Sequence, residues 1–323
     1  MKARLALMVA AVLLVRVAGA DSSVQLIEAR RIWDAAPHNA FTDLLRHQGE
    51  WFCVLREGRG HVSDDGALRV ITSRDGKKWE SAALIQSATG DLRDAKITLT
   101  PAGELMLSGA VALRQPSEHR HLSIAWFSRD GRKWSDPVTI GEPDMWLWRT
   151  TWHGGRAYSL GYDTKGERFT RLYSSRDGRS FETLVPRFFD QEMPNESSIL
   201  FDPDGAAFCL LRRDGKPGTG LLGTARPPYT NWEWKDLGAR IGGPHMLRLS
   251  DGRLLAAVRL YDGNVRTSLC WITRDGRMTE FLKLPSGGDT SYAGLAWSDG
   301  LLWVSYYSSH EEKTAIYLAR VKL

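Results

Sequence analysis

The sequence predicts an all-β protein folded as a six-bladed β-propeller. Three observations predict it: a turn motif recurs at intervals near 50 residues, alternating apolar and polar residues precede its copies, and helical periodicity is missing. A period of this size in an all-β chain is typical of four-stranded propeller blades. We therefore expect residues 21–323 to form a single propeller domain.

The repeated motif has the form Ser/Thr-Arg-Asp-Gly, and in three copies an aromatic residue follows the glycine by three positions. The aspartates are separated by 55, 47 and 98 positions, so one copy has decayed within the last interval, where 225–234 keeps only an aromatic end. Asp accepts hydrogen bonds from nearby amides, Gly takes a positive φ and the aromatic ring packs back onto the sheet. The four copies lie at 73–79, 128–134, 175–181 and 273–278.

These turns define the limits of the expected blades. The N-terminal segment 24–33 is expected to pair with the last blade, because ring closure removes the exposed edges of an open array. The six blades are expected at 36–82, 90–138, 145–188, 193–238, 241–284 and 289–323.

The first twenty residues have the layout of a secretory signal peptide. Lys2 and Arg4 precede an apolar run over 5–15, and small residues end it, so cleavage is expected after Ala20. The run is too short to span a bilayer, which takes about 20 residues. No later segment is apolar enough for a membrane helix, so we expect a secreted or periplasmic protein without membrane insertion.

The composition argues against several partners and cofactors. The chain has 43 basic and 38 acidic residues, and removing the leader lowers the net charge to +2, without a basic run for nucleic acid. The Gly218–Gly223 stretch matches a dinucleotide pattern but no helix follows it. Neither Cys/His spacing for zinc nor an acidic cluster for calcium is evident, so no metal or cofactor is expected. Three cysteines are expected to be buried free thiols: Cys53, Cys209 and Cys270.

Alternate loops of an up-and-down blade lie on opposite faces of a propeller. The repeated turn joins the third and fourth strands, so it lies on one face and is expected to be structural. The end of the second strand and the start of the first strand then lie on the other face. We expect the chemistry there.

Three predicted second strands end with an arginine after four apolar residues. A charge is unusual in this position unless it meets a partner, and guanidinium groups bind carboxylates through paired hydrogen bonds. Convergence of the three side chains near the propeller axis would therefore predict an anionic ligand. The alternative is that each one pairs with a neighbouring acid of the chain. The three residues are Arg56, Arg212 and Arg259.

The starts of three predicted first strands add acids and a phenol to the same face: Arg93-Asp94, Asn195-Glu196-Ser197 and Asp289-Thr290-Ser291-Tyr292. The repeated turn resembles the Asp box of the sialidase superfamily, and this resemblance covers the whole chain after the leader. Glu196 followed by Arg212 is similar to the glutamate and second arginine of that family. Arg259 followed by the segment 291–295 is similar to its third arginine and its tyrosine motif.

The resemblance implies an exo-glycosidase that removes a terminal acidic sugar from extracellular glycans. It implies Tyr292 as nucleophile, Glu196 as its helper, arginines that hold the sugar carboxylate and an aspartate as acid/base. The chemistry is consistent, because a phenol is a poor nucleophile at pH 7 until a carboxylate takes its proton. Sialidases are an exception to the usual two-carboxylate scheme.

The first blade departs from the family pattern. Residues 37–42 stand where sialidases carry an Arg-Ile-Pro motif, so Arg56 or Arg93 would have to replace the first arginine. The expected acid/base aspartate is also missing, which leaves Glu57 and Asp94 as candidates. Three histidines are expected to be binding or structural residues rather than the acid of the reaction: His38, His61 and His245.

Other functions stay open. An altered arginine set suits another acidic sugar, such as a uronic acid, and a propeller lyase would use Tyr292 or a histidine as base. A non-catalytic sugar-binding propeller would keep the turns and lose the chemistry. Its tryptophans could stack on sugar rings or fill the core, and the sequence does not indicate an oligomeric state. The tryptophans are Trp146, Trp148, Trp152, Trp232 and Trp234.

Overall fold

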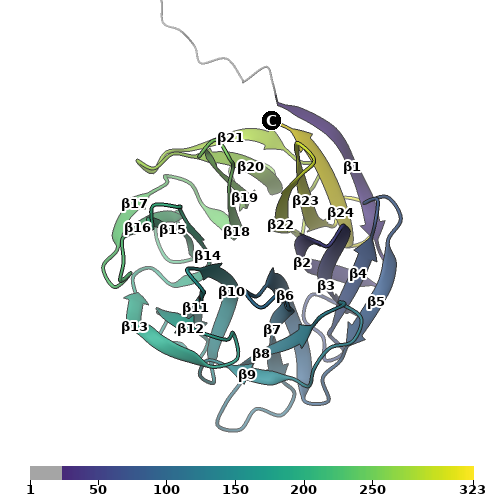
Figure 1. Cartoon of the computed structure of the whole chain (residues 1–323), viewed down its shortest axis with the longest axis horizontal. Coiled ribbons are helices and arrows are strands. Elements are labelled where there is room, and N and C mark those ends of the chain that lie inside the picture. Colours follow the sequence, from purple (N-terminus) through teal and green to yellow (C-terminus); the bar gives the residue numbers. More distant parts are fainter. Residues whose placement is uncertain (1–23) are drawn as a thin grey trace, which may run out of the picture.

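The computed structural model describes residues 24–323, and every regular element in this range is a β-strand. The strands form six four-stranded sheets arranged as blades around a central axis (Figure 1). The predicted six-bladed propeller is confirmed. The expected leader at 1–20 lies outside the described residues, and within residues 24–323 no helix has the length and apolar character to cross a membrane.

In each of the first five blades, four consecutive strands run from the axis to the rim (Figure 1). Blade by blade, their bounds are β2 (His38–His47), β3 (Glu50–Gly58), β4 (Ala67–Ser73), β5 (Glu80–Ile85); β6 (Gly90–Leu99), β7 (Leu105–Leu113), β8 (His121–Ser128), β9 (Val138–Ile140); β10 (Met145–His153), β11 (Arg156–Asp163), β12 (Thr170–Ser175), β13 (Phe181–Phe189); β14 (Pro194–Phe201), β15 (Ala207–Arg213), β16 (Leu221–Ala225), β17 (Glu233–Asp236); β18 (Ile241–Arg248), β19 (Leu254–Leu260), β20 (Arg266–Ile272), β21 (Met278–Lys283).

The sixth blade joins the two ends of the described chain. It contains β22 (Thr290–Ser298), β23 (Leu301–Ser308) and β24 (Ala315–Lys322), with β1 (Gln25–Trp33) as its outermost strand. β1 pairs antiparallel with β24, and Ala29 lies opposite Ala319. The expected closure by the N-terminal segment is therefore confirmed, and Figure 1 shows the purple β1 alongside the yellow β24.

The repeated turns join the third and fourth strands, as predicted. Asp75 Oδ1 accepts hydrogen bonds from the amides of Lys77 (2.7 Å) and Lys78 (3.0 Å), and Asp130 and Asp177 accept equivalent pairs. These bonds close the turn, and they explain why the motif requires Asp at this position. The fourth copy differs, because its aspartate Oδ2 accepts from the Arg277 side chain instead, at 3.0 Å.

Gly131 shows how closely these turns pack on the neighbouring blade. It has φ +70°, and a Cβ added there would lie 2.3 Å from a ring carbon of Phe52. Gly103 has a similar φ of +78° with nothing within 4 Å, so it is a matched control. We expect Gly131→Ala to lower the free energy of unfolding by about 1–3 kcal/mol more than Gly103→Ala, the usual cost of overpacking. Urea unfolding measures this, and equal losses would contradict the packing described.

All six innermost strands contain a β-bulge near their start. The pairing with the second strand is lost over two residues in each blade, at 41–42, 94–95, 148–149, 195–196, 243–244 and 292–293. A bulge bends its strand and redirects side chains. Phe41, Asp94 and Tyr292 have positive φ of 59°, 56° and 49°, which is rare for such residues. Strained backbone of this kind clusters at functional sites.

Polar side chains with little exposure also lie along the inner strands, at the bulges or just after them. Arg149 Nη1 lies 2.8 Å from Asp43 Oδ2, and His245 Nδ1 lies 3.0 Å from the Ala293 carbonyl oxygen. Burial lowers the pKa of His245 to about 3, and Arg149 adds to this effect. His245 is therefore neutral in the folded protein across the physiological range.

This histidine predicts a specific pH dependence of stability. The unfolded chain binds a proton at this residue below about pH 6.5, whereas the folded chain does not until about pH 3. Its contribution to stability is thus complete above pH 6.5 and is lost as the pH falls toward 3. Between pH 7 and pH 5, the free energy of unfolding should fall by about 2 kcal/mol more in wild type than in His245→Gln. Urea unfolding at both pH values measures this, and identical pH dependence would contradict it.

Candidate active site

The bulges of separate blades bring Tyr292 and Glu196 into contact. The Tyr292 hydroxyl donates a hydrogen bond to Glu196 Oε1 at 2.5 Å. Arg212, near the end of β15, places Nη1 2.8 Å from the same carboxylate oxygen and 3.4 Å from the tyrosine hydroxyl. The three residues therefore form a compact buried cluster. As the sequence predicted, Tyr292 and Glu196 come from the starts of first strands, and Arg212 comes from the end of a second strand.

Glu196 is held as a carboxylate. Its Oε2 accepts the amide of Gly243 at 2.8 Å. Burial opposes ionisation, but Arg212 and the hydrogen bonds outweigh it and keep the pKa of Glu196 below its usual value. A Cβ on Gly243, which has φ +54°, would lie 3.0 Å from the Tyr292 nitrogen, so this close approach depends on glycine.

Tyr292 is held as a neutral phenol. Burial and the neighbouring Glu196 charge raise the pKa of Tyr292 well above its usual value. Arg212 Nη1 lies 3.4 Å from the phenol oxygen and the guanidinium of Arg259 lies 5.2 Å from the ring centroid, so positive charge is available if the phenol loses its proton. The arrangement can transfer that proton to Glu196 during a reaction rather than before it.

Arg212 and Arg259 already have partners within the chain. Asp214 accepts from Nε and Nη2 of Arg212 at 3.2 and 3.1 Å. Arg259 donates from Nε to the Thr290 carbonyl at 2.6 Å and from Nη2 to the Tyr307 hydroxyl at 2.9 Å. Each arginine side chain is only 14% exposed. These contacts fix both guanidinium groups and limit the donors that remain for a ligand.

Arg93 is differently placed. Its Nε is buried and has no hydrogen-bond partner among the described residues, and its nearest acid, Asp91, is 4.0 Å away. The guanidinium lies 5.5 Å from the Phe41 ring and 5.9 Å from the Trp146 ring. Phe41 in turn lies 5.2 Å from the Tyr292 ring. Arg93 is thus a cation beside the cluster with hydrogen-bonding capacity left for an anionic ligand.

Asp94 lies within electrostatic reach of Glu196 and Tyr292. Burial raises the pKa of Asp94, although Lys96 and Arg93 oppose the shift. A carboxyl group with a raised pKa is suited to act as a general acid. Of the two acid/base candidates from the sequence, the structure brings Asp94 to the cluster.

Glu57 lies elsewhere. Its Oε1 accepts from Trp33 Nε1 at 2.6 Å, and its Oε2 lies 2.9 Å from Arg69 Nη2. It therefore connects the first blade to β1 of the sixth blade. The interpretation of Glu57 as an acid/base residue is corrected, because its side chain is engaged in this contact between blades.

The prediction that Arg56 binds an anionic ligand is also corrected. It is fully buried, with Nε donating to Asp91 at 2.9 Å and Nη1 donating to the Gly60 carbonyl at 2.8 Å. Its Nη2 donates to Ser63, so the guanidinium holds the loop after β3 and has no exposed surface for a ligand. The expected convergence of second-strand arginines holds for Arg212 and Arg259 only. For Arg56 the alternative applies, a pair with an acid of the chain.

Two tyrosines of this region were not singled out from the sequence. Tyr162 stacks on Trp146 at 6.0 Å and 12°, and burial raises its pKa, with Asp94, Glu196 and Tyr292 adding to the shift. The Tyr307 hydroxyl donates to Asp289 at 2.8 Å. Both tyrosines are the next-to-last residue of a second strand, as Arg212 and Arg259 are. The next-to-last position of the second strand in every blade, and not only where it is an arginine, is therefore the sequence signal that identifies them.

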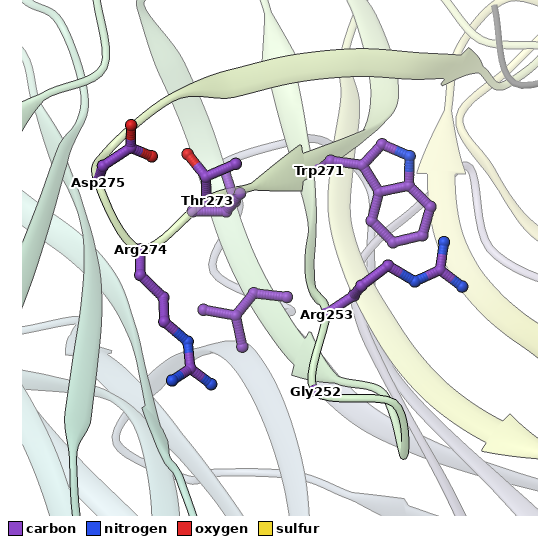
Figure 2. A pocket seen from close by; sticks show the side chains of 8 residues that line it. Gly252, Arg253, Trp271, Thr273, Arg274 and Asp275 are labelled. Carbon is purple, nitrogen blue, oxygen red and sulfur yellow. The ribbon is translucent and has the colours of Figure 1, made fainter.

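A groove lies on the opposite face of the molecule. It has a volume of about 580 Å³, and its lining includes Arg253, Trp271 and the turn residues 273–275. Figure 2 shows Arg253 beside Trp271, with its guanidinium 4.5 Å from the ring centroid. Because this groove is built on a repeated turn, it lies away from the Tyr292 cluster.

Comparison with known proteins supports the fold. No family model and no curated protein matches the chain. A Dyadobacter fermentans protein of unknown function is similar in structure, with a TM-score of 0.81 and 19% identity over 94% of this chain and all of that one. A Penicillium chrysogenum α-L-arabinanase complexed with arabinobiose gives 0.72 and 14%, over 92% and 98%. Trypanosoma rangeli sialidase in complex with sialic acid gives 0.67 and 13%, over 92% and 57%. At these identities the likeness shows a six-bladed propeller shared with glycoside hydrolases.

Proposed function

We propose that this protein is an exported retaining exo-glycosidase of sialidase type that removes a terminal acidic sugar from glycans. The observation that carries the proposal is the 2.5 Å hydrogen bond from the buried Tyr292 phenol to the ionised Glu196, with Arg212 on the same carboxylate oxygen. Tyrosine hydroxyl and carboxylate are arranged as a nucleophile and its base.

In the proposed reaction, the Tyr292 oxygen bonds to the anomeric carbon as its proton passes to Glu196. The glycosidic bond breaks, and Asp94 gives a proton to the leaving oxygen. Water then attacks the glycosyl-tyrosine, giving one proton to Asp94, while Glu196 returns its proton to the phenol. A neutral nucleophile also avoids repulsion from a carboxylate on the reacting sugar.

Arg93 supports an acidic substrate. Its guanidinium lies beside the cluster, 5.5 Å from the Phe41 ring and 5.9 Å from the Trp146 ring, and its side chain is 18% exposed. A sugar carboxylate would pair with the terminal nitrogens of this guanidinium rather than with the enclosed Nε. Arg212 and Arg259 add positive charge on the same face. The proposed location outside the cytoplasm rests on the leader-like segment at 1–20.

One observation favours a second candidate, a glycosidase acting on a neutral sugar. Two of the arginines already contact acids of the chain, Arg212 with Asp214 at 3.0 Å and Arg259 with Asp289 at 3.8 Å. Acids that satisfy these cations leave less need for a substrate carboxylate. The similar arabinanase fold was solved with a neutral disaccharide, arabinobiose.

A panel of 4-methylumbelliferyl glycosides separates these possibilities: a sialoside, a glucuronide and an arabinofuranoside, each with wild type and Arg93→Met. We expect turnover of an acidic sugar, with a KM raised about 10- to 100-fold in Arg93→Met, because a hydrogen bond to a charged group is lost. Turnover of the arabinoside alone, with an unchanged KM in the variant, would support the second candidate. Wild type inactive on the whole panel would overturn the enzyme proposal.

A further inference from the structure

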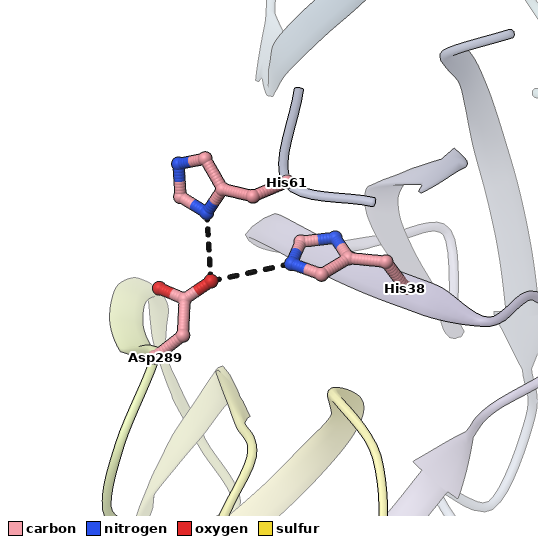
Figure 3. A group of neighbouring side chains, drawn as sticks. All are labelled: His38, His61 and Asp289. Carbon is pink, nitrogen blue, oxygen red and sulfur yellow. Dashed lines mark hydrogen bonds and ion pairs between the residues drawn. The ribbon is translucent and has the colours of Figure 1, made fainter. Parts of the chain in front are cut away.

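A second group of polar side chains lies on the same face, beside the Tyr292 cluster. It contains His38 at the start of β2, His61 in the loop after β3, and Asp289 just before β22. Figure 3 shows the two imidazole rings directed at one carboxylate oxygen. His38 Nε2 lies 3.2 Å and His61 Nδ1 lies 2.7 Å from Asp289 Oδ2.

These donor atoms match the ligands of a transition-metal site. All three lie within 4.8 Å of one another. Two imidazole nitrogens and one carboxylate oxygen suit zinc and similar divalent ions, whereas calcium and magnesium prefer oxygen ligands alone. Zinc–ligand distances of about 2.0–2.2 Å place the ligand atoms of a tetrahedral site roughly 3.3 Å apart. The two contacts of Asp289 Oδ2, 3.2 Å to His38 and 2.7 Å to His61, are already near that spacing.

The surroundings of Asp289 support this assignment. The Tyr307 hydroxyl donates to Oδ1 at 2.8 Å, which orients the carboxylate and leaves Oδ2 toward the imidazoles. Hydrogen bonds of this kind commonly orient metal-binding carboxylates. His38 is buried, whereas the His61 side chain is 48% exposed, so an ion could enter from solvent. Arg259 lies 3.8 Å from Oδ1, and its charge would moderate the affinity.

We propose that His38, His61 and Asp289 bind one zinc-like divalent ion at the edge of the candidate active site. Three protein ligands leave a fourth position open for water or a ligand oxygen. The His61 ring meets the Phe41 ring edge-on at 5.0 Å, and Phe41 contacts Tyr292, so the ion would lie one side chain away from the proposed nucleophile. The ligands come from the first and sixth blades, which is why local spacing of histidines did not reveal the site.

Isothermal titration calorimetry of the purified protein, free of a polyhistidine tag and stripped with EDTA, tests this site with zinc sulfate. We expect one ion per chain in wild type. His61→Ala should weaken zinc binding by about 100-fold or more, because it removes a ligand rather than a supporting contact. Asp289→Asn should weaken it as well. Zinc binding does not require glycosidase activity, so this result is independent of the proposed function.

His119→Ala is the matched control. His119 also pairs through Nδ1 with a carboxylate, Asp144 at 3.0 Å, and its side chain is 37% exposed, but no second imidazole joins the pair among the described residues. This variant should bind zinc like wild type. Absence of saturable zinc binding in wild type would overturn the proposal. Equal affinity in wild type and His61→Ala would overturn it too.

Discussion

Tyr292→Phe is expected to lower kcat on an aryl sialoside by on the order of 10³-fold or more, the scale seen when a nucleophile is removed. The variant keeps the buried ring and its contacts with Phe41 and Trp148, at 5.2 and 5.3 Å, but loses the oxygen that would bond to the sugar. It also removes the hydrogen bond to Glu196. Steady-state kinetics measures the loss.

Tyr306→Phe is the control for this variant. Tyr306 is also fully buried in the sixth blade, and its hydroxyl donates to the Pro285 carbonyl at 2.9 Å, outside the cluster. Its loss should cost about 1 kcal/mol of stability and leave kcat unchanged. Similar kcat losses in both variants would show that the Tyr292 effect reflects folding rather than chemistry.

Glu196→Gln is expected to lower kcat by about 10²- to 10⁴-fold, because the amide cannot take the phenol proton. The pKa of Glu196 is held below 4.5, so the carboxylate is ready as a base at pH 5 and above.

The ionised Glu196 also stabilises the folded protein. This contribution is present above pH 4.5 and is lost as the pH falls through the lowered pKa of Glu196 in the folded state. The variant should therefore lose less stability than wild type below pH 4.5.

Glu57→Gln is the control for Glu196→Gln, because it distinguishes the loss of a catalytic base from the loss of a buried ion pair. Glu57 is as buried as Glu196 and also pairs with an arginine, but it lies between blades rather than at the cluster. We expect its kcat to stay at the wild-type value while its stability falls. A large kcat loss in Glu57→Gln, with none in Glu196→Gln, would contradict the assignment of Glu196.

The fold could be predicted because its determinants are local in sequence. Each Asp-Gly turn forms its hydrogen bonds within a few residues of the chain. The spacing between successive turns gives the number of blades, even where 225–234 has lost the motif. In that blade, Trp232 Nε1 still donates to a carbonyl three residues earlier, as Trp79 does in the first turn. The strand order within each blade then separated the two faces of the propeller.

The site could be predicted only in part, because its geometry depends on contacts between blades. Tyr292 and Glu196 were placed together by the resemblance and by strand position, and they are in contact. The sequence did not show the ring of bulges that directs these side chains to the axis. Nor did the sequence show that Asp91, 35 residues further along the chain, accepts a hydrogen bond from Arg56 and so binds its guanidinium. A charge after an apolar run is the same pattern in a ligand-binding arginine and in a structural one.

The most direct test of Tyr292 as the nucleophile is covalent trapping. Trypanosoma rangeli sialidase has been solved with 2,3-difluorosialic acid as a covalent intermediate. We predict that the same compound adds one glycosyl group to this protein, and that peptide mass spectrometry locates it on Tyr292. Turnover of a sialoside without an adduct on Tyr292, or an adduct on another residue, would contradict the proposed mechanism.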